Sequence, residues 1–299
     1  MKSEKIIIIA VSGIGNAILF TPTLVNLRKK FPKSRIVIFS RNKAIADIFE
    51  GSGYADKIIT FDNYNIIKRL QTLIKIRSQK FDYSITAFPS NKFQFNILAF
   101  IIGARKRITH KYKIGKLTTL SFLQNEKIYA DEKIHDVEQN LNLLRLFSIK
   151  PKKIKKVYFW ISEKNKKFAR LFFKKNKLKG FKIIGIHPGC KKKDKLRRWP
   201  KENFIELINR LNRDKNVKIL LFSGPDEKEL VKFISRRVNT KPIIVEDKEI
   251  KNIASIIERC SLFLSTDSGL GHIAAALNIQ VIAIFGPANY NRTGPYGKN

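Results

Sequence analysis

Short runs rich in β-branched residues alternate with helix-period segments along the whole chain, and this alternation constrains the fold more than any other feature. In the first half, helices are predicted at about 17–30 and 43–51. The predicted strands there are 5–11, 35–39, 57–60, 83–87 and 107–109. Strands that alternate with helices are typical of parallel sheets covered on both faces.

A second series of the same kind follows a basic, glycine-poor region at 150–180. Its predicted helices cover 204–211, 226–238 and 250–260. Its predicted strands are 182–186, 217–222, 262–264 and 281–285. We therefore expect an α/β protein with two Rossmann-like domains that face each other across a cleft, one formed by residues 1–158 and the other by 159–299.

The formal net charge of the 299 residues is +36, which would attract anions over the whole surface. Nucleic acid, anionic lipid headgroups and phosphorylated sugars all fit this charge. A solvated face explains runs such as Lys150–Lys156 equally well. A hydrophobic content of 43% argues against disorder, so the charge belongs to a protein with real cores.

Cysteine content and apolar runs bear on the compartment. Cys190 and Cys260 are the only cysteines and form neither a disulfide framework nor a metal-ligand spacing, which fits a reducing cytoplasm. The N-terminal run at 6–11 predicts a buried strand rather than a signal peptide, because glycines interrupt it. The apolar run Ile97–Ile102 is far shorter than the roughly 20 residues of a membrane span, so we expect at most a peripheral membrane contact.

Two of the loops that follow predicted strands could approach a phosphate. In Ser12–Ala17 two glycines allow a close approach of the backbone, but Ile18 stands where a dinucleotide fingerprint has its third glycine. A dehydrogenase is therefore disfavoured. The stretch His187–Cys190 leads into the basic loop 191–200, whose guanidinium groups could hold a phosphate.

Three further loops lie at strand ends. In 223–227, Asp226 and Glu227 either accept hydrogen bonds from ribose hydroxyls or cap the following helix. In 265–276 the residues Thr266, Asp267 and Ser268 either cap an alanine-rich helix or, with the glycines at 269 and 271, expose backbone N–H groups to a phosphate. The long loop 285–298 could close over a sugar.

Five motifs in order resemble one family over nearly the whole chain: GIGNAILFTPTLVNLRKKFP, HPG with RRWPKENFIELI, SGPDEKEL, STDSGLGHIAAAL, and FGP with YGKN. They are similar to the heptosyltransferase-like glycosyltransferases of family 9, which act on the lipopolysaccharide core and related glycans. TDSGLGHIAAAL followed by FGP is the most specific part. The resemblance implies the GT-B fold of two Rossmann-like domains.

The resemblance also implies roles for particular residues. The family's acidic turn binds the nucleotide-sugar donor: the acid holds sugar hydroxyls, and backbone and small residues meet the pyrophosphate. In this chain the matching residues are Asp267, Ser268, Gly269 and His272. Arg197 would neutralise the charge of the leaving diphosphate, and Glu227 would bind the ribose. Gly189 and Cys190 would line the same corner as Arg197.

The chain departs from the family's pattern in two places. Family members commonly have Gly-Asp in the first loop, where the aspartate deprotonates the acceptor, but this chain has Gly15-Asn16. An amide has no useful basicity, so another group, such as His110 or His135 if either reaches the cleft, would have to serve as the base. Relatives also continue into a closing helix after the position of Asn299, so we expect a truncated C-terminus.

Together these observations predict an inverting, metal-independent glycosyltransferase, with an acceptor-binding domain at 1–158 and a donor-binding domain at 159–299. The absence of any Asp-x-Asp pair leaves the diphosphate to cationic side chains and helix dipoles. We expect no cofactor, ADP-heptose as the simplest donor, an anionic glycolipid or glycan acceptor, and a cytoplasmic position at the inner membrane face. The alternatives are a non-catalytic sugar-nucleotide-binding protein, favoured by Asn16, and a nucleic-acid-binding protein, favoured only by charge.

Overall fold

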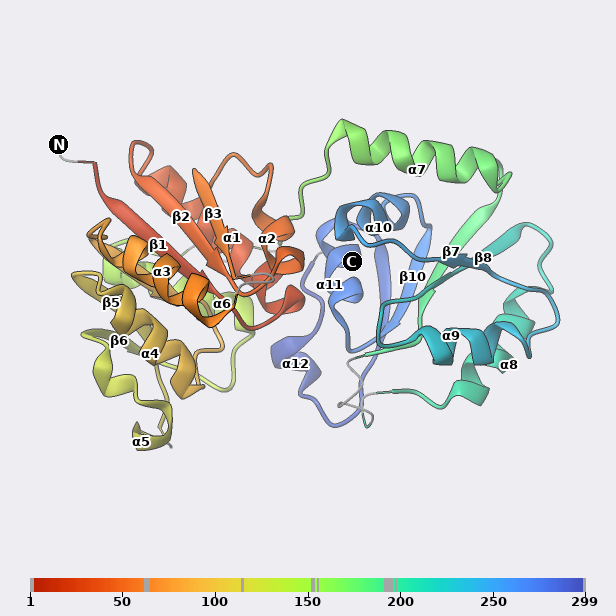
Figure 1. Cartoon of the computed structure of the whole chain (residues 1–299). Helices are drawn as coiled ribbons and strands as arrows, with labels where there is room; N and C mark the ends of the chain where they lie inside the picture. Colours follow the sequence, from red (N-terminus) through yellow and green to blue (C-terminus); the bar gives the residue numbers. More distant parts are fainter. Residues whose placement is uncertain are drawn as a thin grey trace. The chain divides into compact units, whose positions relative to one another are not determined.

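In a computed structural model the chain forms two compact units, Met1–Trp160 and Ile161–Asn299. The structure describes residues 3–61, 65–113, 116–151, 154, 156–190, 196 and 198–297. Each unit is built on one parallel sheet with helices packed against it (Figure 1). The prediction of two α/β domains is confirmed.

The first unit contains a six-stranded sheet in the order β3-β2-β1-β4-β5-β6, and every neighbouring pair is parallel. The chain moves outward from β1 to β3 and then crosses to β4, so the switch point lies between β1 and β4. The strands are β1 (Lys5–Ala10), β2 (Arg35–Ser40), β3 (Lys57–Thr60), β4 (Tyr83–Thr86), β5 (Lys106–Lys111) and β6 (Glu126–Tyr129).

Helices cover both faces of this sheet. On one face Ile7 and Ile9 of β1 pack in a core with Ile76 and Ile102, which come from α3 and α4. Alternation along β1 directs Ile6 and Ile8 to the other face, where they are also fully buried. The helices are α1 (Ile14–Lys30), α2 (Lys43–Phe49), α3 (Ile66–Arg77), α4 (Phe93–Ile102), α5 (Lys116–Thr119) and α6 (Asp136–Asn142), with short 3₁₀ turns η1 (Ser121–Leu123) and η2 (Leu143–Phe147).

The second unit contains a five-stranded parallel sheet in the order β11-β10-β7-β8-β9. Its switch point lies between β7 and β10, because β8 and β9 extend on one side of β7 and the chain then returns to the other. The strands are β7 (Lys182–His187), β8 (Val217–Phe222), β9 (Ile243–Val245), β10 (Leu262–Thr266) and β11 (Gln280–Ile284).

Helices pack against the second sheet as the apolar spacing predicts. Phe204 and Ile208 of α8 join Val231 and Ile234 of α9 in one buried cluster with β7 and β8. The basic region at 150–180, predicted only as a separator, contains a helix that opens with a capping box between Ser162 and Asn165. The helices are α7 (Glu163–Lys175), α8 (Lys201–Leu211), α9 (Lys228–Ser235), α10 (Ile250–Ile257), α11 (Gly269–Ala276) and α12 (Tyr290–Thr293).

The apolar helices of both units are short. Within the described ranges, no helix has the length and hydrophobicity needed to cross a membrane. The run Ile97–Ile102 forms the second half of α4, and its Ala99 and Ile102 pack into the core of the first unit.

Candidate functional site

Three of the predicted site loops meet at the carboxyl edge of the second sheet. They follow β7, β8 and β10, which are neighbours in the order β10-β7-β8. The hydroxyl of Thr266 at the end of β10 donates a hydrogen bond of 2.6 Å to the carbonyl oxygen of Gly189 after β7. This bond ties the two loops on either side of the switch point, where open α/β sheets bind their ligands.

Glu227 reaches from the loop after β8 to the loop after β7. Its side chain occupies the space that a Cβ atom would take at Gly189, and its carboxylate lies against Gly224. Although Glu227 stands at the N-cap of α9, its side chain makes no capping hydrogen bond, so the interpretation of Glu227 as a helix cap is wrong. The carboxylate is instead held over the β7 loop.

Burial is the main reason why the pKa of Glu227 is raised above its usual value, and the nearby Asp226 adds to the shift. Arg198 and a hydrogen bond from the Gly224 backbone act in the opposite direction. Burial makes a carboxylate costly to keep charged, and ligand hydroxyl groups would lower that cost.

The Ser268 side chain lies beside a histidine and does not cap α11, although Ser268 stands at the start of that helix. It is the N-cap residue, yet its side chain makes no capping bond, so the capping interpretation is wrong for Ser268. Its hydroxyl lies 2.9 Å from Nδ1 of His187 at the end of β7. Burial, assisted by the positive charge of Arg198, lowers the pKa of His187 to about 4, so the imidazole is neutral at pH 7.

Asp267, Gly269 and His272 lie on the turn from β10 into α11. Asp267 is partly exposed and its backbone N–H donates to the carbonyl oxygen of Ile284 in β11. Gly269 is the first residue of α11, and His272 is buried one turn later. Gly271, expected to expose backbone to a phosphate, instead makes room for the Ser265 hydroxyl of β10, so its role is helix–strand packing.

The basic loop after β7 is described only in part. Arg197, the predicted diphosphate ligand, lies outside the described residues. The neighbouring Arg198 donates a 2.8 Å hydrogen bond to the carbonyl oxygen of the buried Cys190. The sequence places Arg198 in the basic loop 191–200 but assigns the diphosphate to Arg197, so the contact of Arg198 with Cys190 was not predicted. Its charge acts on both His187 and Glu227.

Asn16 belongs to the first unit. The sequence predicts a loop as far as residue 16, but α1 begins at Ile14, so Asn16 lies in its first turn at the carboxyl end of β1. The residue is partly exposed. The Ser12 hydroxyl donates a hydrogen bond of 3.2 Å to the carbonyl oxygen of Pro89. This bond joins the loops that follow β1 and β4 at the switch point.

The two histidines proposed as alternative bases both take part in the packing or capping of the first unit. His110 is fully buried, with Nε2 3.0 Å from the carbonyl oxygen of Gln139, and burial lowers its pKa to about 4. His135 caps α6: its Nδ1 accepts the backbone N–H of Val137 at 3.2 Å. Both therefore serve the fold of the first unit.

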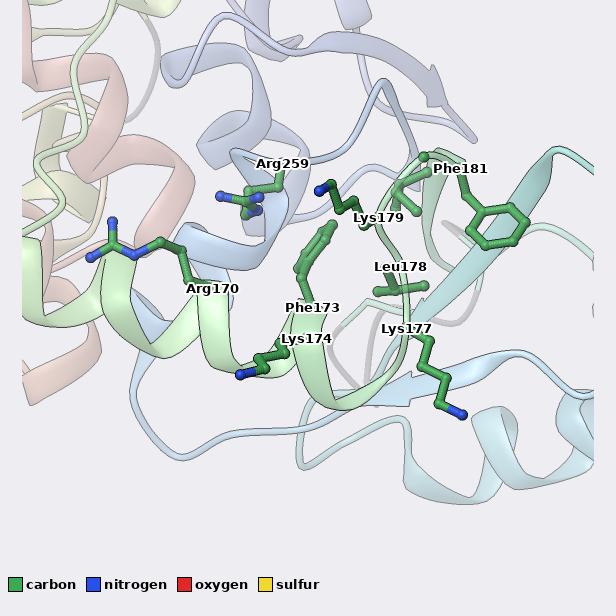
Figure 2. Close-up of a pocket in the computed structure, with 10 residues that line it drawn as sticks. Arg170, Phe173, Lys174, Lys177, Leu178, Lys179, Phe181 and Arg259 are labelled. Atoms are coloured by element: carbon green, nitrogen blue, oxygen red, sulfur yellow. The ribbon is translucent and has the colours of Figure 1, made fainter.

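A hollow of about 600 Å³ lies at the opposite edge of the second sheet (Figure 2). It is bordered by Phe181 and Ile183 at the start of β7, and by Arg259, whose guanidinium carbon lies 4.7 Å from the ring centre of Phe173. Lys174 and Lys177 at the end of α7 also border it. The hollow lies at the amino end of β7, opposite the edge at which open α/β sheets bind their ligands, so we do not assign the donor to it.

Burial raises the pKa of the Cys260 thiol to about 12, so this cysteine is inert. Across the residues that the structure describes, no three His, Cys, Asp or Glu side chains are grouped so that they could hold a metal ion.

The sequence profile of glycosyltransferase family 9 (heptosyltransferase) matches residues 69–299. The chain belongs to this family. The expectation of a glycosyltransferase is therefore confirmed. Among relatives of this family 9 enzyme, lipooligosaccharide heptosyltransferase 2 of Campylobacter jejuni is 26% identical over 304 residues, covering 98% of this chain and 84% of that protein. Lipopolysaccharide heptosyltransferase 3 of Escherichia coli is 26% identical, covering 95% and 83%.

Solved structures agree on the fold of this family 9 glycosyltransferase. A family 9 glycosyl transferase from Veillonella parvula superposes with a TM-score of 0.84 at 24% identity, covering 98% of this chain and 83% of that one. The E. coli ADP-heptose lps heptosyltransferase II gives a TM-score of 0.79 at 20% identity, covering 98% and 88%. The GT-B fold expected from the sequence is confirmed.

Proposed function

We propose that this glycosyltransferase moves heptose from ADP-heptose to a lipopolysaccharide-type acceptor. The relatives that span nearly the whole chain are named as heptosyltransferases of lipooligosaccharide or lipopolysaccharide. One solved neighbour, an E. coli heptosyltransferase with a TM-score of 0.77, is a complex with ADP. The observation that carries the proposal is the junction of the β7, β8 and β10 loops around Gly189.

In this proposal the donor binds at the carboxyl edge of the second unit, within residues 159–299. The carboxylate of Glu227 accepts hydrogen bonds from the ribose hydroxyls, and its buried position over Gly189 supports this role. The pyrophosphate meets the first backbone N–H groups of α11 at Gly269, beside Ser268 and His272, while Asp267 holds sugar hydroxyls. Arg197 neutralises the diphosphate, and Gly189 and Cys190 line the same corner.

The proposed reaction is a single displacement with inversion. An acceptor hydroxyl oxygen forms a bond to the anomeric carbon while the bond from that carbon to the β-phosphate oxygen breaks. The hydroxyl proton leaves to a base, and ADP departs with an additional negative charge. We assign the stabilisation of this charge to Arg197 and the N-terminus of α11, which makes the enzyme metal-independent.

The acceptor is assigned to the first unit, residues 1–158, where Asn16 stands at the position of the family's base. An amide can orient the acceptor hydroxyl but cannot take its proton. The burial of His110 and the capping role of His135 support a different origin for the base, such as water or the acceptor itself. We propose a cytoplasmic enzyme that meets an anionic glycolipid at the inner membrane face and binds no specific nucleic acid.

The test is a panel of nucleotide sugars followed by thermal stability and by acceptor-dependent release of nucleoside diphosphate. A ligand that binds the folded state raises the melting temperature by mass action. We expect the largest rise with ADP-heptose, no turnover for Asp267→Ala, and normal turnover for Asp214→Ala, an exposed aspartate in the turn before β8. Near-normal transfer by Asp267→Ala, or binding only to polyanions and only at low salt, would contradict the proposal.

A further inference from the structure

Helix α3 carries an apolar stripe that the protein leaves uncovered. Four of its aliphatic side chains are between 54 and 68% exposed: Ile66, Ile67, Leu70 and Ile74. At about 100° per residue these positions fall on one side of the helix. Ile76 lies on the opposite side of the helix, buried in the core, and Leu73 is partly buried at the edge of the stripe, where it packs against that core.

Helix α4 continues the uncovered surface. The two helices lie side by side over the sheet of the first unit (Figure 1). Nη1 of Arg77 donates a hydrogen bond of 2.9 Å to the carbonyl oxygen of Ile101, which connects the C-terminal ends of the two helices. Three apolar side chains of α4 and one of the neighbouring η1 are between 39 and 55% exposed: Phe93, Phe100, Ile101 and Phe122. We call these eight residues the α3–α4 face.

The segment that carries the α3–α4 face is predominantly cationic. Residues 65–126, which include α3, α4 and η1, contain twelve lysines and arginines and two acids. Asp82 accepts a hydrogen bond of 2.9 Å from the backbone N–H of Lys5, and Glu126 lies 3.5 Å from Nζ of Lys106, so each acid is paired within the first unit. The guanidinium of Arg107 lies 5.6 Å from the ring centre of Phe100, which places a cation beside the apolar surface.

We propose that the α3–α4 face docks onto a lipid bilayer with anionic headgroups. Exposed Ile, Leu and Phe side chains with Lys and Arg at their edge are the chemistry of a helix that lies in a membrane interface. Each basic side chain near an anionic surface adds to the attraction. The inference deepens the proposed function, on which it rests only for the lipid-linked nature of the acceptor.

Charge distinguishes this partner from a second copy of the chain. Two copies joined through the α3–α4 face would bring two nearly acid-free, cationic surfaces together, within chains of net charge +36. An anionic bilayer instead complements the charge and covers the apolar side chains. Docking would hold the first unit, to which the acceptor is assigned, at the surface where a glycolipid resides.

The experiment is co-sedimentation of the purified full chain with vesicles of phosphatidylcholine alone or with 30% phosphatidylglycerol, without donor or acceptor. We expect partition to the anionic vesicles at least about tenfold above that to the neutral ones, weakened by salt. Leu70→Glu/Ile74→Glu should lower this partition at least about tenfold, because it places two anions in the apolar stripe.

Leu171→Glu is the matched control, since Leu171 on α7 is exposed to a similar extent as Leu70. We expect this variant to bind like the natural protein, and circular dichroism melts to be unchanged for both variants. Equal losses in both variants, unchanged binding by the double variant, or a concentration-dependent dimer that the double variant abolishes would overturn the proposal. Vesicle binding is read without turnover, so a protein that binds vesicles but releases no ADP counts against the proposed function alone.

Discussion

The side chain of Glu227 fills the space that a Cβ atom would need at Gly189, although the two residues follow different strands. Two of the proposed donor ligands are thus mutually dependent: the glycine is required because the acid lies over it. The same carboxylate also restricts Gly224, whose added Cβ would meet its oxygen.

Gly189→Ala should therefore lower the melting temperature and weaken ADP binding together. Overpacking a filled site costs about 1–3 kcal/mol, and the displaced Glu227 would no longer meet the ribose. Differential scanning calorimetry and ADP titration measure the two effects. The double variant Gly189→Ala/Glu227→Ala should recover the melting temperature but not the affinity, and a double variant as unstable as Gly189→Ala would contradict the contact.

Arg197 and Arg198 should differ in their effect on diphosphate binding. Only Arg197 has the family's spacing before Trp199, and loss of a charge-assisted contact costs about 1.5–3 kcal/mol. Arg198→Ala should mainly lower the melting temperature, because the hydrogen bond of Arg198 to the carbonyl oxygen of Cys190 would be lost. Titration with ADP checks the order. Equal losses of affinity would indicate a diffuse basic loop rather than a specific ligand.

Acid should destabilise the first unit through His110. Its pKa falls from 6.5 to about 4 on folding, so between these values the unfolded chain binds a proton that the folded chain excludes. Stability from this group is complete above about pH 6.5 and is lost as the pH falls towards 4, by up to about 3 kcal/mol. His110→Gln should flatten this dependence.

The measurement is urea unfolding at pH 7 and pH 4.5, followed by tryptophan fluorescence. The chain has two tryptophans, Trp160 in the first unit and Trp199 in the second, so Trp199→Phe leaves a reporter for the first unit alone. The same background with and without His110→Gln isolates the histidine. If both proteins lose equal stability between the two pH values, His110 is not the titrating group.

The sequence predicts most strands, including the edge strands β3 and β11, but not the edge strands β6 and β9. β1 and β8 lie inside their sheets, so most residues on both of their faces are buried and the strands are rich in apolar residues. β6 and β9 lie at sheet edges. β6 is short and half polar, and β9 has three residues, so neither gives a periodic signal.

Site positions are also more predictable than site contacts. Parallel strands end at one edge, which is why motifs at 187–190, 223–227 and 265–276 could be expected to converge. The bond between His187 and Ser268 joins residues 81 apart, and nothing local signals it. The exposed stripe of α3 was equally hidden, because apolar residues at helical spacing ordinarily indicate a buried face.

The remaining prediction concerns Asn16, in a first turn of α1 that holds no acidic residue. Asn16→Asp would place a carboxylate beside the free N–H groups of a helix N-terminus, which stabilises helices by about 0.3–1 kcal/mol. The near-isosteric change should therefore preserve or slightly raise the melting temperature. Asn16→Ala is the control that offers neither an amide nor a base.

If transfer is limited by a missing base, Asn16→Asp should raise the rate by a factor on the order of 10² to 10⁴, the usual contribution of a positioned general base. Acceptor-dependent release of ADP by the three proteins measures this, with Asn16→Ala no faster than the natural enzyme. A natural enzyme that is already fast and is slowed by the aspartate would show that the site works around the amide, so that the proton leaves by another route. Release from none of the three, with ADP-heptose still bound, would indicate a sugar-nucleotide-binding protein without turnover of this donor.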